Sequence, residues 1–138
     1  MTPPTHLPVT SRGTTVTRAT PASLAVDIAC VLLFCAIGRR SHAEGITLAG
    51  VAQTAWPFLS GTAAGWLLSR GWRRPTALVP TGVTVWVATV IVGMLLRKAS
   101  AQGVAASFVV VASLVTAVLL LGWRLLLAGR ATRAARAK

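Results

Sequence analysis

The chain has 138 residues, of which 54% are hydrophobic, and its mean hydropathy is +0.71. This composition excludes a soluble basic domain, because such a protein needs more polar side chains to cover its surface. The formal net charge of +12 would suggest a nucleic-acid partner in a soluble protein. Here the basic residues stand at the ends of apolar runs instead of forming one basic face, so we expect no nucleic-acid binding.

Four apolar runs follow one another along the chain, and each is long enough to cross a bilayer as a helix. A hydrocarbon core of about 30 Å needs roughly 20 apolar residues in a helix. Loops of seven residues join the runs, so consecutive helices must be antiparallel neighbours. The sequence therefore predicts an all-α integral membrane protein, a compact four-transmembrane-helix up-down bundle. Its spans are expected at residues 22–38, 46–69, 77–96 and 104–127, within a membrane domain of residues 21–128.

The predicted topology follows from the basic residues. Residues 1–20 are rich in Thr and Pro and hold no long apolar run, so we expect a disordered tail. With this tail in the cytoplasm, ten of the 14 basic residues are cytoplasmic and four lie on the far side. The positive-inside bias thus places both termini in the cytoplasm of a multi-pass protein of the plasma membrane. The basic cytoplasmic tail of residues 129–138 is expected to contact anionic lipids through Arg130, Arg133 and Arg136.

Asp27 is the only acidic residue inside a predicted span. An unpaired carboxylate in a membrane is costly, so Asp27 needs either a partner or a function. One interpretation is a structural ion pair with Arg124, or with Arg70. The other is a carboxylate that exchanges protons or cations in a cavity. We favour the pair with Arg124, because both residues lie near the same membrane surface.

Cys30 and Cys35 lie five positions apart in the first span, on different helix faces. They predict packing residues, and no disulfide framework, metal site or cofactor follows from them. Ser41 and Ala43 after this run form a small-x-small cleavage pattern, which makes a signal peptide the alternative. The run begins late and carries a charge, so we expect a retained span.

The second run contains Pro57 near its middle, which predicts a kink and a carbonyl left without its helical donor. A buried indole N–H from Trp56 or Trp86 is a candidate donor for such a carbonyl. Beyond the kink, Gly61 and Gly65 are four residues apart and predict a smooth stripe for close helix contact. We interpret the stripe as a seam for a possible homodimer. The cytoplasmic aromatic belt is expected to contain Trp66, Trp72 and Trp123.

Four basic residues are predicted on the far side, against the positive-inside bias, and form a candidate outer basic cluster. Three explanations stay open: a ring that attracts an anion, contact with lipid phosphates, or pairing with Glu44. We weight lipid contact above anion selection. Polar residues Ser41 and His42 stand in the same loop, and a single histidine predicts no metal site. The cluster consists of Arg39, Arg40, Arg97 and Lys98.

The two far-side loops also resemble each other. Residues 39–45 align without gaps on residues 97–103, at an offset of 58, with three identical positions. If the likeness reflects duplication, the chain consists of two repeated helical hairpins related by an axis along the membrane normal. The flanking helices match poorly, so independent origin of the two loops is the alternative.

Spaced Gly, Trp and charged positions between Leu24 and Leu127 are similar to a known family. This family comprises small bacterial four-span membrane proteins and is called domain of unknown function 3054. The resemblance implies a four-helix membrane protein without an established activity, and it raises interest in the charged, proline and loop positions. The residues that carry it are Asp27, Gly38-Arg39-Arg40-Ser41-His42, Trp56-Pro57-Phe58, Gly65-Trp66, Trp86, Gly93, Arg97, Gly103, Ser107-Phe108 and Gly122-Trp123-Arg124.

The sequence contains no nucleophile elbow, phosphate loop or metal-ligand spacing, and its two acidic residues leave little for acid–base catalysis. We therefore expect that the protein is not an enzyme. The leading hypothesis is small-solute or ion transport, or a channel-like activity, in a homo-oligomer. The alternative is a structural or accessory membrane subunit without a transport pathway.

Overall fold

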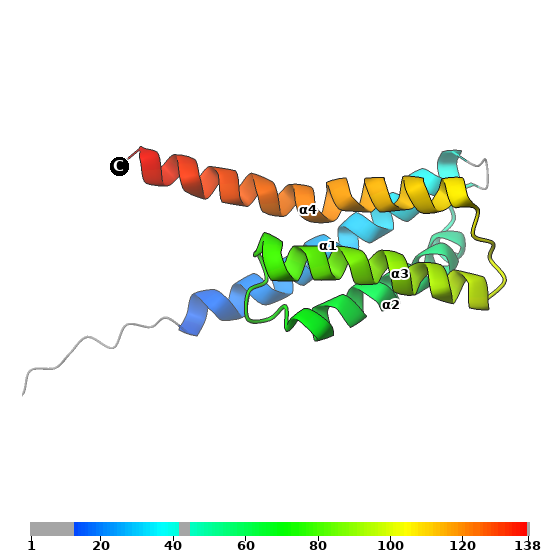
Figure 1. Ribbon diagram of the computed structural model, residues 1–138, viewed down its shortest axis with the longest axis horizontal. Coiled ribbons are helices and arrows are strands. Elements are labelled where there is room, and N and C mark those ends of the chain that lie inside the picture. Colours follow the sequence, from blue (N-terminus) through cyan, green and yellow to red (C-terminus); the bar gives the residue numbers. More distant parts are fainter. Residues whose placement is uncertain (1–12, 42–44, 138) are drawn as a thin grey trace, which may run out of the picture.

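The computed structural model describes residues 13–41 and 45–137. These residues form four α-helices: α1 (Gly13–Ser41), α2 (Leu48–Ser69), α3 (Val83–Ala99) and α4 (Ala106–Arg136). A short π-helix, η1 (Leu78–Gly82), leads into α3. Figure 1 shows α2 and α3 as an antiparallel hairpin, while α1 and α4 run along the same bundle. The prediction of an all-helical chain is confirmed for the described residues.

Among residues 13–41 and 45–137, three helical segments are long and apolar enough to cross a membrane. These are Ala19–Arg40, Leu78–Ala99 and Ala106–Arg136. Helix α2 is not among them, so the prediction that all four runs are apolar enough is wrong for this run. The reason lies in its composition, since α2 contains Gln, Ser, Thr, Gly and Pro among its apolar residues. Several of these small and hydroxyl residues form the contact with α3.

The contact between α2 and α3 is close because glycines of α2 face the backbone of α3. A Cβ atom on Gly61 would lie 2.7 Å from the Ala88 carbonyl oxygen, and one on Gly65 would lie 2.6 Å from Val85 Cα. Both glycines are therefore covered by the same chain. The prediction that this stripe is a homodimer seam is wrong, and any homo-oligomer must use another surface.

Polar groups between α2 and α3 are satisfied within the bundle. The buried Thr62 and Thr89 hydroxyls share a hydrogen bond of 2.9 Å. Pro57 lies buried inside α2 and cannot donate to the carbonyl of Gln53. The side-chain amide of Gln102 reaches that carbonyl at 3.5 Å. The Trp86 indole, a candidate donor for the Gln53 carbonyl, does not bond to it. Trp86 Nε1 donates to the Ser113 carbonyl of α4 at 3.0 Å.

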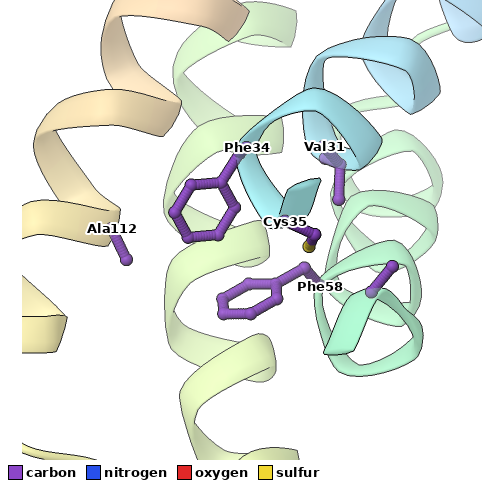
Figure 2. Close-up of a cluster of buried hydrophobic side chains, with 6 residues drawn as sticks. Val31, Phe34, Cys35, Phe58 and Ala112 are labelled. Carbon is purple, nitrogen blue, oxygen red and sulfur yellow. The ribbon is translucent and has the colours of Figure 1, made fainter. Parts of the chain in front are cut away.

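A cluster of buried hydrophobic side chains joins α1, α2 and α4 (Figure 2). The rings of Phe34 and Phe58 meet edge to face, with centroids 5.2 Å apart. Phe58 also covers Gly93 of α3, where a Cβ atom would lie 2.5 Å from the ring. Both cysteines are free, and Cys35 is buried in this cluster. The buried residues of the cluster are Val31, Phe34, Cys35, Ala55, Phe58 and Ala112.

The helices extend further into both tails than the sequence indicates. Helix α1 begins at Gly13, so residues 13–20 of the predicted disordered tail are helical, and Pro21 lies inside the helix. Helix α4 continues to Arg136, so most of the predicted basic tail is also helical. Residues 1–12 lie outside the described part of the chain. Both terminal helix ends lie at the same end of the bundle, at the left of Figure 1.

The predicted duplication remains a prediction. In the two loops proposed as copies, Gly45 and Gly103 adopt left-handed conformations with φ of +76° and +79°. This conformation explains why glycine stands at both positions, since other residues adopt it with strain. Residues 42–44 of the first loop lie outside the described residues.

Candidate functional site

The chain carries two polar clusters at opposite ends of the bundle. The first surrounds Asp27 and Arg124, and the carbonyl of Pro75 in the loop between α2 and η1 belongs to it. The second surrounds Arg39 and Arg97 at the other end, where α1 and α3 finish. The charged residues of both clusters are candidates from the sequence, but the two clusters differ in geometry.

Asp27 and Arg124 form a buried ion pair. Both side chains have 0% of their surface exposed. Arg124 donates from Nη1 to Asp27 Oδ1 at 2.9 Å and from Nη2 to Asp27 Oδ2 at 2.7 Å. Two parallel bonds of this kind use the planar fork of the guanidinium and fix its orientation. The structure thus brings together α1 and α4 at the pair that the sequence favoured, while the alternative partner Arg70 is exposed.

Two tryptophans also donate hydrogen bonds to the Asp27 carboxylate of this pair. Trp66 Nε1 donates to Asp27 Oδ2 at 2.9 Å, and Trp123 Nε1 donates to Asp27 Oδ1 at 3.0 Å. The Arg124 guanidinium also stacks over the Trp123 ring at 4.3 Å from its centroid. The place of these two indoles in the cytoplasmic aromatic belt stays a prediction, and their bonds to Asp27 add a role that the sequence did not indicate. The missed signal is that an indole N–H is donor-only and a buried one needs an acceptor.

The donor side of Arg124 is also complete. Its Nε and Nη2 donate to the Pro75 carbonyl at 3.2 and 3.1 Å, and Nη1 donates to the Leu120 carbonyl at 3.0 Å. All five N–H groups of the guanidinium are therefore used. We call Asp27, Arg124, Trp66, Trp123 and Pro75 the Asp27 clamp. It connects α1, α2, α4 and the loop before η1, and its carboxylate has no open side at which to exchange a proton or cation.

The second cluster borders a cavity of about 610 Å³. We call it the Arg39–Arg97 cavity. Arg39 donates to the Gly45 carbonyl at 3.0 Å and to the Thr54 hydroxyl at 3.2 Å. Its guanidinium lies against Gly50, where a Cβ atom would overlap the guanidinium in its present position. Glycine at position 50 therefore leaves room for the Arg39 side chain to reach from α1 to α2.

Arg97 reaches the same cavity from α3. It donates from Nη1 to Gln102 Oε1 at 3.1 Å and from Nη2 to the Gln102 carbonyl at 3.2 Å. Its guanidinium lies 4.6 Å from the centroid of Phe108, a distance at which a cation is attracted to the ring face. Arg97 is thus held in place by the loop on one side and by α4 on the other.

The structure divides the predicted outer basic cluster. Arg39 and Arg97 line the cavity, whereas Arg40 and Lys98 are exposed and are not part of its wall. Ser41 ends α1, but its side chain lies outside what the structure describes, as does His42. The four residues predicted to form one outer basic cluster therefore lie in two different environments.

The cavity wall combines hydrogen-bonding and apolar groups. Besides the two arginines, its polar wall includes Gln53, Thr54, Gln102 and Ser107, and its apolar wall includes Phe34, Phe108, Val104 and Val111. Guanidinium groups match the geometry of carboxylates and phosphates. Within the described residues, no group of three or more His, Cys, Asp or Glu side chains could hold a metal ion. The arrangement is therefore suited to binding an anion.

Comparison with known proteins identifies a family and no closer relative. The model of the family described as "Protein of unknown function (DUF3054)" matches residues 24–127. No curated protein and no solved structure matches the chain. The matched range includes both the Asp27 clamp and the Arg39–Arg97 cavity.

Proposed function

Because the chain belongs to the DUF3054 family, a family of unknown function, we propose its function from its geometry. The protein is a multi-pass membrane protein that binds a small anion in the Arg39–Arg97 cavity and transports it. One observation carries this proposal: two arginines from different helices, 58 residues apart, line the same cavity of about 610 Å³. An arrangement of this kind is how pores and transporters select anions.

The position of these arginines supports the proposal. Basic residues on the far side of a membrane protein oppose the positive-inside bias, so a binding role explains their presence. Lipid contact explains exposed residues such as Arg40 and Lys98. It explains Arg39 and Arg97 less well, because Thr54, Gln102 and Phe108 hold them toward the cavity.

We propose that α2 also crosses the membrane. Its hydropathy is low because Gly61, Thr62 and Gly65 are present, but these residues are buried against α3 and need not contact lipid. Four crossings place both termini on the cytoplasmic side, as the basic residues indicate. If only α1, α3 and α4 crossed, Ala43 and Lys138 would lie on the same side.

Reporter fusions test this topology. We expect reporters at Ala43 and at Lys138 to give opposite sidedness, with Ala43 outside the cell. Reporters on the same side would reject the four-span architecture and would make α2 a helix that does not cross.

The second candidate function is a structural or accessory membrane subunit. The Asp27 clamp favours it, because the saturated ion pair closes the bundle at the end opposite the cavity. A subunit of this kind would keep the fold but carry no flux. It differs from the leading proposal in one measurable property, which is anion movement across a bilayer.

A flux assay in proteoliposomes separates these functions. The probes are chloride, inorganic phosphate and acetate, each with potassium flux as the cation comparison. We expect flux of at least one of these anions, reduced about tenfold or more by Arg97→Gln, since the loss of a buried charge contact is worth at least about 1.4 kcal/mol. The matched control is Lys98→Gln, which removes the neighbouring exposed charge. No anion flux above empty liposomes, or equal flux in both variants, would reject transport through the cavity.

A further inference from the structure

A second cavity of about 500 Å³ lies between α1 and α4, at the clamp end of the bundle. We call it the α1–α4 groove. Apolar and small side chains form most of its wall, and Arg130 is the one charged residue among the described residues that line it. Its wall consists of Ala19, Ala22, Ser23 and Val26 from α1, Trp123, Leu126, Leu127 and Arg130 from α4, and Thr76 from the loop.

The groove lies between two facing helix stripes that have the same residue spacing. The four α1 residues and the four α4 residues follow the same spacing of three, four and seven positions, which places each set on one helix face. The α1 stripe consists of small residues and the α4 stripe of large ones.

The Asp27 clamp joins α1 and α4 beside the groove. Trp123 lines the groove and donates to Asp27 on α1 at 3.0 Å. Arg124, the next residue, is tied to the Pro75 carbonyl. Beyond this level, the free end of α4 diverges from α1, as Figure 1 shows at the left. The two stripes therefore leave a groove between them on the side of the bundle.

The chemistry of the groove points to one kind of occupant. Its wall extends about 10 Å along α1, from Ala19 to Val26, and one leaflet of a hydrocarbon core is about 15 Å thick. An acyl chain therefore fits along the groove within one leaflet. Arg130 stands about 10 Å along α4 from Trp123, toward the helix terminus, where a lipid headgroup would lie. We propose that the α1–α4 groove binds an anionic phospholipid, with one acyl chain against Trp123 and the phosphate at Arg130.

A second copy of the chain fits the groove less well. Helix α4 contains no acidic residue, and Arg133 and Arg136 follow Arg130 in its last two turns. In a symmetric dimer the same surface meets itself, so arginines of both copies would face each other. Anionic phosphate groups neutralise these charges, whereas a second α4 would add to them.

Lipid retention measured by native mass spectrometry tests this proposal. The purified full chain is exchanged into detergent with phosphatidylglycerol or phosphatidylcholine. We expect one retained phosphatidylglycerol per chain, bound at least about fivefold more tightly than phosphatidylcholine, since each Arg near an anionic surface contributes about 1 kcal/mol. Arg130→Gln should remove this preference. Arg136→Gln, six residues further along α4 and outside the groove wall, is the matched control.

A second measurement locates the acyl chain. Phosphatidylglycerol with brominated acyl chains should quench the tryptophan fluorescence more than its phosphatidylcholine analogue, because Trp123 lines the groove. Ala22→Phe fills the groove and should abolish this difference. Equal retention of both lipids, equal losses in Arg130→Gln and Arg136→Gln, quenching unchanged by Ala22→Phe, or a dimer that excludes phosphatidylglycerol would each overturn the proposal.

Discussion

The two arginine clusters use the same side chain for opposite purposes. At the Asp27 clamp, Arg124 is fully buried and its five N–H groups all meet protein acceptors. At the other end, Arg39 and Arg97 are positioned by loop carbonyls and by Phe108, and they border about 610 Å³ of space. The comparison shows that charge alone does not mark a functional site in a helical bundle. What matters is whether the surrounding atoms leave room for a ligand.

The largest expected effect is at the clamp. Asp27→Asn leaves Arg124 without its carboxylate in a buried place, and breaking such a pair typically costs about 3–5 kcal/mol. We expect a correspondingly large fall in the thermal stability of the purified protein in detergent. Adding Arg124→Gln should recover part of the loss, because the uncompensated charge is removed. A stable Asp27→Asn protein, with additive effects in the double variant, would show that the pair is not structural.

The next largest effect is expected at the close contact between α2 and α3. Gly61→Leu places a side chain against the backbone of α3, where even a Cβ atom would be 2.7 Å from the Ala88 oxygen. Overpacking of this kind costs about 1–3 kcal/mol, so the unfolding temperature should fall. Gly122→Leu on α4 is the matched control, because nothing lies within 4 Å of its Cβ position. Equal stability of the two variants would contradict the close α2–α3 contact.

A smaller effect tests the indole donors of the clamp. Trp123→Phe keeps a ring beneath Arg124 but removes the N–H that donates to Asp27 at 3.0 Å. The loss of one such hydrogen bond should cost about 1–2 kcal/mol. Trp72→Phe, at an exposed position of the loop, should change the stability little. If both variants unfold at the temperature of the native chain, the indole does not contribute to the clamp.

The smallest stability effect is expected at the cavity. Arg97→Gln removes a guanidinium that stacks on Phe108, a contact worth about 0.5–1 kcal/mol, and its bonds to Gln102 border the open cavity, where water can replace them. The variant should therefore unfold close to the native temperature while its anion flux is reduced. A loss of stability as large as that of Asp27→Asn would make Arg97 a structural residue and would remove the contrast between the two ends.

Several features could be predicted from the sequence because they depend on distance along the chain. The apolar runs indicated the helices, and the similar depth of Asp27 and Arg124 indicated their pairing. Features that depend on how each helix is rotated could not be predicted. A glycine stripe shows that a helix can approach closely, but it does not show which helix approaches, so Gly61 and Gly65 were assigned to a dimer.

The candidate site shows the same limit. The loop position of Arg39 and Arg97 indicated that they lie at one end of the bundle, but their convergence depends on how the loops fold back. The roles of Trp66 and Trp123 depend on which face of each helix meets Asp27. The prediction overestimated the hydropathy of α2, because its polar residues are spread among apolar ones.

The bonds from Arg124 to the Pro75 carbonyl have a mechanical consequence. They fasten α4 near its middle to a loop that belongs to the α2–α3 hairpin, so this point of the helix is a fulcrum. Ala106 lies 18 residues away, or about 27 Å, and a tilt of about 10° at the fulcrum would displace it by about 5 Å. A tilt of α4 about this point would therefore displace the helix more beside Arg97 than at the Asp27 clamp, and it would have to break the Trp86 bond to the Ser113 carbonyl.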